Sequence, residues 1–226
     1  MHLLFDLDGT LTDPFLGITR CIQYALDSLG LPVPPPEGLR WCIGPPLQES
    51  FAILLGTENE HLADLALTKY RERFSTLGRF ENQVCPGIEN GLAELNGCGH
   101  SLGVATSKPR IFARPILDHF RLAKYFRSID GSELDGARKD KAELIAHILK
   151  RDGIAAADAI MIGDREYDII GARQNGVAGL GVLWGYGSRE EQESAGAYAC
   201  VTSPADLAAV VSRVQCDHWT KLAKVL

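Results

Sequence analysis

The sequence predicts an α/β protein: a Rossmann-like core with a mostly parallel sheet, into which an all-helical cap is inserted. Two observations support this prediction. Strand patterns alternate with helical patterns through residues 84–226, and one further strand pattern opens the chain, whereas the stretch between them has helical periodicity alone. We therefore expect residues 1–13 and 84–226 to form the α/β core and residues 14–83 to form the helical cap.

The first helix of the cap is predicted to start at Asp13 and Pro14, the last residue of the core segment and the first of the cap, because an aspartate can cap a helix and a proline suits its first turn. An apolar face at helical spacing follows, and Gly30 ends this first helix. A proline-rich turn at residues 31–36 then leads to two more predicted helices, at residues 47–55 and 58–74.

The core elements follow from the same alternation. We expect helices at residues 88–95, 110–119, 140–151, 166–175, 188–195 and 204–212, and strands at residues 102–105, 126–129, 159–162, 178–183 and 199–201. The tail at residues 215–226 is open between a short amphipathic helix and an irregular surface terminus.

The composition narrows the classes of function. A net charge of −6 without a basic run argues against nucleic acid, and no apolar stretch approaches the length that spans a membrane. The first strand starts without a basic and apolar leader before it, so we expect a cytoplasmic protein. The six cysteines are scattered, which argues against a disulfide framework or a metal cluster. A monomer and a homodimer both stay open.

The most informative stretch runs from Phe5 to Asp13. It places Asp6 and Asp8 at the carboxyl end of the first strand, and Gly9 then allows a sharp turn while Thr10 adds a hydroxyl. Two acids at such a place suit a hard cation and a phosphate, because one carboxylate can attack phosphorus while the other moves a proton.

Three further groups fall at the carboxyl ends of later strands, where parallel sheets bind their ligands. Thr106 and Ser107 offer hydroxyls that can hold phosphate oxygens. Lys141 opens a helix, an unfavourable place for a cation unless it offsets nearby negative charge, although Arg138 and Lys139 compete for this role. A final pair of acids, Asp164 and Asp168, follows a strand and a glycine and suits a Mg²⁺ site.

These four groups resemble, in order, the four motifs of the haloacid dehalogenase-like hydrolases, a superfamily of Mg²⁺-dependent phosphatases and relatives. The resemblance implies that Asp6 is the nucleophile and that Asp8 is the general acid and base. It implies that Thr106, with Ser107, Gly9 and Thr10 nearby, binds the phosphoryl group, and that Lys141 steadies the nucleophile and the phosphate. It also implies that Asp6, the Asp8 carbonyl and Asp164 bind Mg²⁺, with Asp168 in support.

Within the superfamily, the segments at residues 84–88 and 176–177 resemble the phosphoglycolate phosphatase branch. The segments at residues 43–51 and 163–165 resemble bacterial members labelled 5′-nucleotidase, although Arg165 replaces the small hydroxyl residue that is more usual there. This resemblance implies hydrolysis of a small phosphorylated metabolite, either phosphoglycolate or a nucleoside 5′-monophosphate. Arg40 is a candidate for contacting the substrate from the cap.

Two alternatives stay open at this point. A phosphotransferase of the β-phosphoglucomutase type shares this layout and would depend on a bisphosphate activator. A non-catalytic regulator that binds a phosphorylated ligand is the second alternative, because a fold alone does not give a function.

Overall fold

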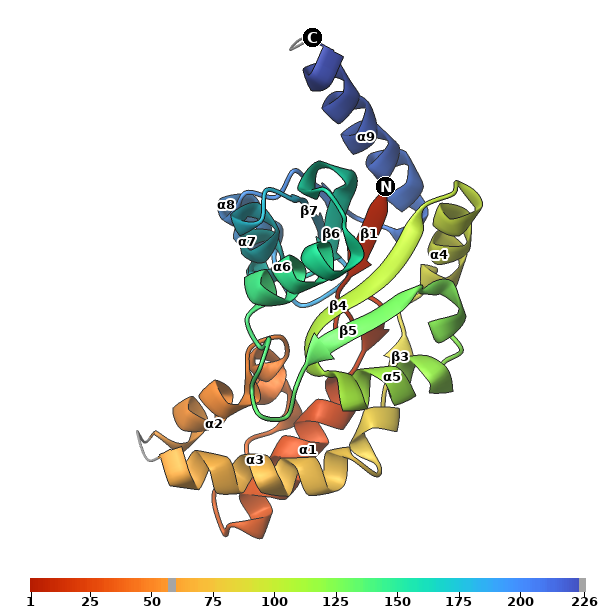
Figure 1. The fold of residues 1–226 in the computed structure, drawn as a ribbon. Helices are drawn as coiled ribbons and strands as arrows, with labels where there is room; N and C mark the ends of the chain where they lie inside the picture. Colours follow the sequence, from red (N-terminus) through yellow and green to blue (C-terminus); the bar gives the residue numbers. More distant parts are fainter. Residues whose placement is uncertain (57–59, 224–226) are drawn as a thin grey trace. The chain divides into compact units, whose positions relative to one another are not determined.

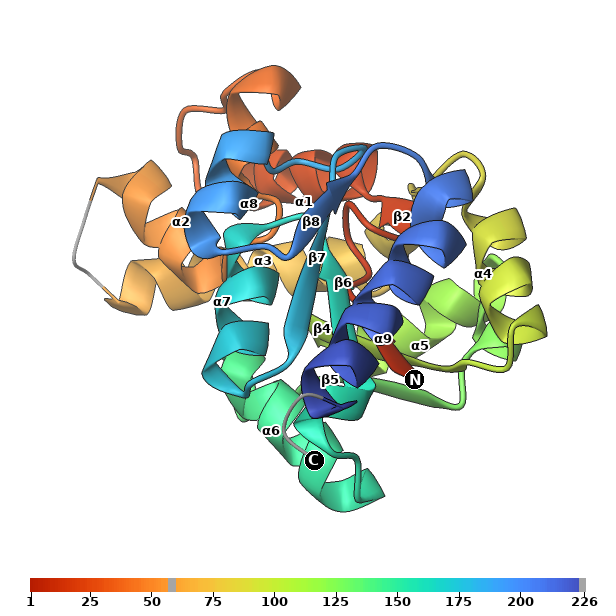
Figure 2. The ribbon, with the colours of Figure 1, turned by 90° about the horizontal axis from the view of Figure 1, so that it is seen from above.

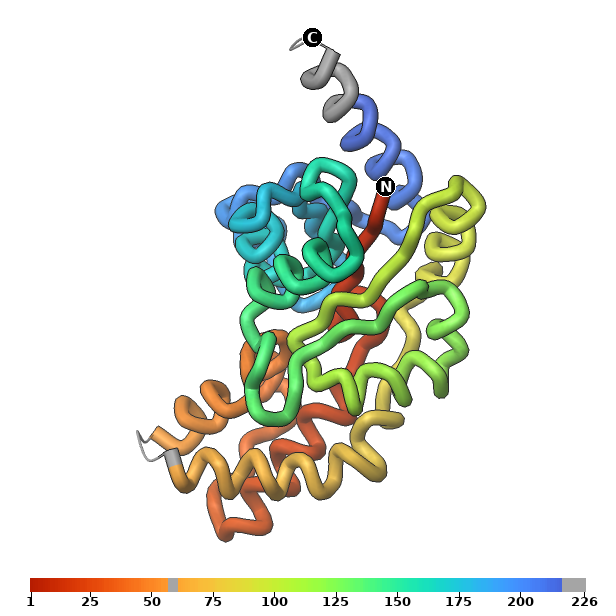
Figure 3. The backbone as a smooth tube through the Cα atoms, viewed as in Figure 1, coloured from red at the N-terminus to blue at the C-terminus, as the bar shows by residue number. Residues whose placement is uncertain are grey.

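The computed structural model describes residues 1–56 and 60–223. The chain forms two compact units: Met1–Leu11 with Val84–Leu226 make the first, and Thr12–Gln83 makes the second. Figure 3 traces the backbone as it leaves the first unit after its opening strand and later returns to it. The use of the second unit as a cap stays a prediction.

The first unit is built on a six-stranded parallel sheet, as predicted (Figures 1 and 2). Its strand order is β5-β4-β1-β6-β7-β8, so the strand that comes first in the sequence lies inside the sheet between β4 and β6. The strands are β1 (His2–Phe5), β4 (Ser101–Pro109), β5 (Ser128–Ser132), β6 (Ala159–Gly163), β7 (Ala178–Val182) and β8 (Ala199–Val201).

Helices cover both faces of this sheet, because its central strands are apolar on both sides. Leu4 of β1 packs with Met161 and Ala105 under α6 and α7, while Phe5 points to the opposite face and meets the ring of Phe126. Figures 1 and 2 show α4 and α5 on the side away from α6 and α7. The helices are α4 (Ile88–Gly97), α5 (Arg110–His119), α6 (Lys141–Asp152), α7 (Glu166–Gln174), α8 (Arg189–Ala195) and α9 (Leu207–Ala223).

The second unit is helical apart from β2 (Thr12–Asp13), which pairs with β3 (Gln83–Val84) where the chain passes between the units. Its helices are α1 (Phe15–Ser28), α2 (Leu47–Leu55) and α3 (Glu60–Phe74), with 3₁₀ turns at Pro36–Cys42 and Gly78–Phe80. Asp13 accepts a hydrogen bond from the Phe15 N–H. The N-cap position of α1 is nevertheless Pro14, so the prediction of Asp13 as the cap and Pro14 in the first turn was wrong by one residue. Glu81 then pairs with Arg73 and Arg20 within this unit.

Several predicted bounds were wrong. β4 continues through residues 106–109, which were predicted to follow the strand, because Pro109 pairs with Ser132 after a shift in register. β5 begins and ends later than predicted, and α9 continues well beyond residue 212. The tail is therefore helical as far as Ala223, and residues 224–226 lie outside the described residues. Among the described helices, we find none that combines the length and apolarity needed to cross a membrane.

Candidate active site

The candidate site lies at the carboxyl ends of β1, β4 and β6 in the first unit. Within the sheet, β4 and β5 lie on one side of β1. The chain then crosses over, so that β6 pairs with β1 on its other side. This reversal of strand order is a topological switch point, and open parallel sheets bind their ligands beside the carboxyl ends of the strands at such points. The hydrogen bond from the Asp6 N–H to the Ile162 carbonyl (2.9 Å) continues the β1–β6 ladder into the site.

Lys141 contacts two of the acidic side chains of the site, Asp6 and Asp168. Its Nζ lies 2.9 Å from Asp6 Oδ1 and 2.7 Å from Asp168 Oδ1, and it donates to the Ala105 carbonyl at 2.8 Å. Burial of the Lys141 ammonium opposes its charge, but attraction to the two carboxylates outweighs burial and raises the pKa of Lys141. The structure thus brings Lys141 to the acids. Arg138, a competitor in the sequence, pairs with Glu133 instead.

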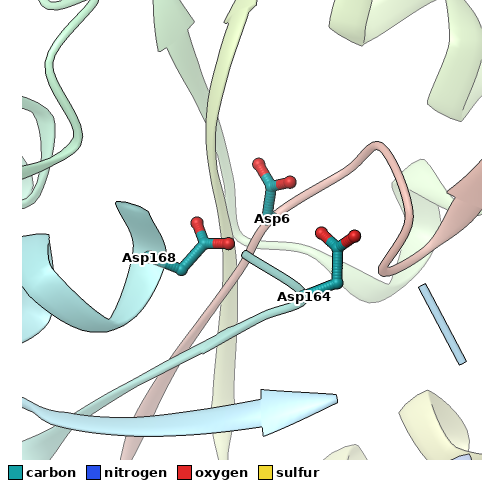
Figure 4. A group of neighbouring side chains, drawn as sticks. All are labelled: Asp6, Asp164 and Asp168. Carbon is teal, nitrogen blue, oxygen red and sulfur yellow. The ribbon is translucent and has the colours of Figure 1, made fainter. Parts of the chain in front are cut away.

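Three carboxylates converge beside this lysine. The side chains of Asp6, Asp164 and Asp168 lie near one another and project in the same general direction (Figure 4), and each offers an oxygen within 4.8 Å of the others. Burial raises the pKa of Asp164 well above its ordinary value, and repulsion from Asp6 and Asp168 raises it further. The three carboxylates outnumber the ammonium group of Lys141, which contacts two of them.

Asp8 is held separately from this cluster. Its Oδ2 lies 2.7 Å from the buried Nζ of Lys108, and its Oδ1 is a buried oxygen that accepts no hydrogen bond from the residues that the structure describes. Burial raises the pKa of Asp8, although the Lys108 charge acts in the opposite direction. The two acids of the first motif thus have different lysine partners, which suits two different roles.

The predicted phosphate-binding residues line the same edge. Thr106 is buried, and its hydroxyl accepts a hydrogen bond from the Lys108 N–H at 3.2 Å. Ser107 follows, with its carbonyl fixed by the Ser132 hydroxyl at 2.7 Å. Thr10 is buried, and its hydroxyl lies 3.5 Å from Asp164 Oδ1.

Gly9 has a structural reason to be glycine. Its φ is +82°, which favours glycine, and a Cβ built there would lie 2.2 Å from Asp164 Oδ2. Gly163 is packed as closely, since its Cβ would lie 2.1 Å from Asp168 Oδ2. Bare backbone at these two positions makes room for the carboxylates.

Arg40 lies in the second unit, where it is exposed. Its guanidinium stands 5.9 Å from the centre of the Phe15 ring. Its predicted contact with a substrate stays a prediction.

Sequence reasoning missed the segment that follows β7. The Tyr186 N–H donates to Asp164 Oδ2 at 2.8 Å, and the Trp184 indole donates to the Thr10 carbonyl at 3.0 Å. Gly185 allows this approach, because its Cβ would lie 2.4 Å from the Asp164 Cβ. A backbone N–H can be supplied by any residue except proline, so the sequence does not reveal which one donates. The glycines at 185 and 187 were the available sign that the backbone passes close to another group there.

The donor set fits a hard divalent cation. It consists of carboxylate oxygens, which are the ligands that Mg²⁺ prefers, and three of these carboxylates each offer an oxygen within 4.8 Å of the others. Asp168 already uses both of its carboxylate oxygens: Oδ1 forms an ion pair with Lys141, and Oδ2 accepts a hydrogen bond from the Arg165 N–H at 3.2 Å. Asp6 and Asp164 are therefore the better placed of the three to hold a metal.

Comparison with known proteins places this geometry in context. Residues 3–182 match the family described as haloacid dehalogenase-like hydrolase. A 5′-nucleotidase of Pseudomonas aeruginosa is 51% identical over 190 residues, covering 84% of this chain and 86% of that protein. Phosphoglycolate phosphatase 1 of the same organism is 30% identical, covering 81% and 70%. The crystal structure of a predicted phosphatase from Clostridium acetobutylicum is 44% identical, with a TM-score of 0.89 over 94% of this chain and 98% of that one.

Proposed function

The chain belongs to the haloacid dehalogenase-like hydrolases, the family predicted from its four motifs, and on that premise we propose a specific activity. It is a Mg²⁺-dependent phosphatase that hydrolyses a small phosphomonoester through an aspartyl-phosphate on Asp6. The names of its relatives support phosphoglycolate or a nucleoside 5′-monophosphate as the substrate.

In the first step, an Asp6 oxygen attacks phosphorus while the bond from phosphorus to the leaving oxygen breaks. Asp8 gives its proton to that oxygen, so the alcohol leaves neutral. The burial that raises the pKa of Asp8 favours the protonated acid that this step needs.

In the second step, a water molecule attacks the aspartyl-phosphate, and Asp8, now a carboxylate, takes its proton. The bond between phosphorus and Asp6 breaks, which frees inorganic phosphate and restores the Asp6 carboxylate. Asp8 is protonated again, ready for the next substrate.

Charge neutralisation is the other requirement of phosphoryl transfer. Lys141 holds Asp6 in place and offsets the charge that phosphate brings, while the Thr106 and Ser107 segment offers donors to the phosphoryl oxygens. When bound, Mg²⁺ adds positive charge, held by Asp6, Asp164 and the Asp8 carbonyl.

The buried contact of Lys141 with both Asp6 and Asp168, beside Asp164, is the observation that carries this proposal. Apolar residues would fill the same space at a lower cost in folding free energy. A buried lysine among three acids is therefore better explained by a need for its charge in the site.

The test is phosphate release from a panel of phosphoglycolate, nucleoside monophosphates, sugar phosphates and pyrophosphate, with Mg²⁺ and with EDTA. We expect Mg²⁺-dependent turnover by the wild type and none by Asp6→Asn. The matched control is Asp206→Asn, which neutralises an exposed aspartate of the same unit and should keep full activity. No turnover on any substrate by folded wild type would contradict the proposal.

The same panel addresses the alternatives. Turnover that requires a bisphosphate activator would indicate a phosphotransferase of the mutase type. Binding of a phosphorylated compound without turnover would indicate a regulator. The cytoplasmic location, the monomeric or homodimeric state and the substrate contact of Arg40 stay predictions.

A further inference from the structure

Gln192 of α8 is a fully buried amide that touches the backbone of the site. Its Nε2 donates to the Asp164 carbonyl at 2.8 Å and to the Val182 carbonyl at 2.9 Å. Because both partners can only accept, the amide nitrogen must face them. The Cys200 thiol donates to Oε1 at 3.7 Å, so the amide is satisfied at both ends. Gln192 thus ties the end of β6 to the end of β7.

Glu191, the preceding residue of α8, holds the next two positions of the same loop. Its Oε1 accepts from Arg165 Nε at 2.8 Å and from the Glu166 N–H at 2.9 Å. Arg165 is the residue that replaces the more usual small hydroxyl side chain, and its guanidinium therefore has a defined partner. Two consecutive side chains of α8 thereby fix three consecutive residues, 164–166.

The Asp164 carboxylate depends on this backbone for its position. Its side chain has one short hydrogen bond, from the Tyr186 N–H, and a long one of 3.5 Å to the Thr10 hydroxyl. The main-chain carbonyl of Asp164 is held by the hydrogen bond from Gln192. Metal ligands tolerate displacements of roughly 0.5 Å, so groups that fix a ligand also tune affinity for the metal.

We propose that Gln192 and Glu191 are positioning residues that set the Mg²⁺ affinity of the site by fixing Asp164. This inference rests on the proposed function, because it assumes that Asp164 binds Mg²⁺. Neither residue touches substrate, so their loss changes metal affinity while the KM for the phosphomonoester at saturating Mg²⁺ stays near the wild-type value.

The test is isothermal titration of EDTA-treated protein with Mg²⁺ alone. Gln192→Met keeps the length of the side chain and removes its donors, and Glu191→Met removes the shared acceptor. We expect each to raise the Kd for Mg²⁺ by roughly 10-fold, the lower end for loss of a group that orients a metal ligand. Glu191→Gln retains an acceptor oxygen and should restore most of the affinity.

Two controls separate positioning from stability. Glu190→Met makes the same change at the exposed neighbouring position of α8. Leu95→Ala removes a buried side chain from α4, on the other face of the sheet, and lowers the melting temperature without touching the loop. Both should bind Mg²⁺ as the wild type does.

Wild-type affinity in both Gln192→Met and Glu191→Met would overturn the inference, and the second variant keeps the test available if the first does not fold. Weakened binding in Leu95→Ala would also overturn it, since the effect would then follow stability. A wild type that binds no Mg²⁺ would overturn the magnesium proposal together with this inference. The two failures can be told apart, because failure of the magnesium proposal is seen in the wild type and failure of this inference alone is seen only in the variants.

Discussion

Lys141 and Asp6 form a buried contact of 2.9 Å between the first residue of α6 and the first residue after β1. A cation at a helix N-terminus is unfavourable, and burial adds to its cost. Asp140 caps the N-terminus of α6 by accepting a hydrogen bond from the Glu143 N–H, so the helix is capped without Lys141. The lysine is therefore placed for the site at the expense of the helix.

Lys141→Met should leave Asp6 and Asp168 without their buried countercharge. We expect kcat/KM to fall by at least ~100-fold, the size of effect seen when one charge-stabilising donor is lost. The protein should also lose stability, and Mg²⁺ should raise its melting temperature more than that of the wild type. Lys150→Met, an exposed change at the other end of α6, is the control for both measurements and should affect neither.

Asp164→Asn should stabilise the metal-free protein at neutral pH while removing Mg²⁺ binding. The pKa of Asp164 is raised above 3.8 by burial, so the folded protein binds this proton more tightly than the unfolded chain does. The resulting stability is full at low pH and is lost as pH rises through the folded-state pKa. Neutral asparagine avoids that loss.

Thermal melts in EDTA across pH 4 to 8 measure this effect. A gain of 1 kcal/mol would raise the melting temperature by about 2–4 °C in a protein of this size. The gap between variant and wild type should widen as pH rises, and Mg²⁺ should narrow it by stabilising the wild type alone. A difference in melting temperature that stays constant at every pH would show that the effect does not arise from the charge of Asp164.

Gly9→Ala should abolish activity for a steric reason, and Gly99→Ala is its matched control. The two glycines have φ values of +82° and +81°, so alanine strains both backbones alike, by about 1–2 kcal/mol. A Cβ at Gly9 would collide with Asp164, whereas a Cβ at Gly99 would have no atom of the described, non-neighbouring residues within 4 Å. We expect backbone strain to cost both variants stability, the collision to add to the loss at Gly9, and kcat/KM to fall on the order of 100-fold at Gly9 alone. Equal activity in the two variants would show that backbone strain, rather than the collision, matters.

Glu81→Gln should weaken the second unit in a pH-dependent way. Glu81 accepts two hydrogen bonds from Arg73, at 2.6 and 3.0 Å, and these, with the contact from Arg20, lower the pKa of Glu81. A lowered pKa gives stability that is present above the ordinary value of 4.5 and is lost as pH falls through the folded-state value.

Urea melts should therefore show a loss of about 1 kcal/mol for Glu81→Gln at pH 7, which disappears toward pH 3. Glu72→Gln is the control, because Glu72 pairs with exposed Lys69 on the surface of α3 and should change stability little. A loss that persists at pH 3 would point to packing of Glu81 rather than its charge.

Much of the fold and the candidate site could be predicted because residue type and strand position agree. Asp6 and Asp164 directly follow β1 and β6, and Thr106 lies in the neighbouring strand β4 at the point where its regular pairing with β5 is interrupted. Parallel pairing brings these positions together without further information. Lys141 could be singled out from Lys139 because a cation at the start of a helix needs a reason.

The rest depends on contacts that residue types do not encode. The Tyr186 N–H reaches Asp164 through its backbone, so any residue could stand at that position. Gln192 looks like one more polar residue of a helix until tertiary packing buries it. The extension of β4 to Pro109 follows from a register shift against β5, and a proline in the sequence argued for the opposite.

The place of β1 inside the sheet also has a consequence for synthesis of the chain. Leu3 must wait for Leu102 and Ile160 to leave the ribosome before it has a partner on either side. The Thr12–Gln83 unit is continuous in sequence and lacks this dependence. Long separations between paired residues slow folding, so the nascent chain should complete its helical unit while β1 is still unpaired.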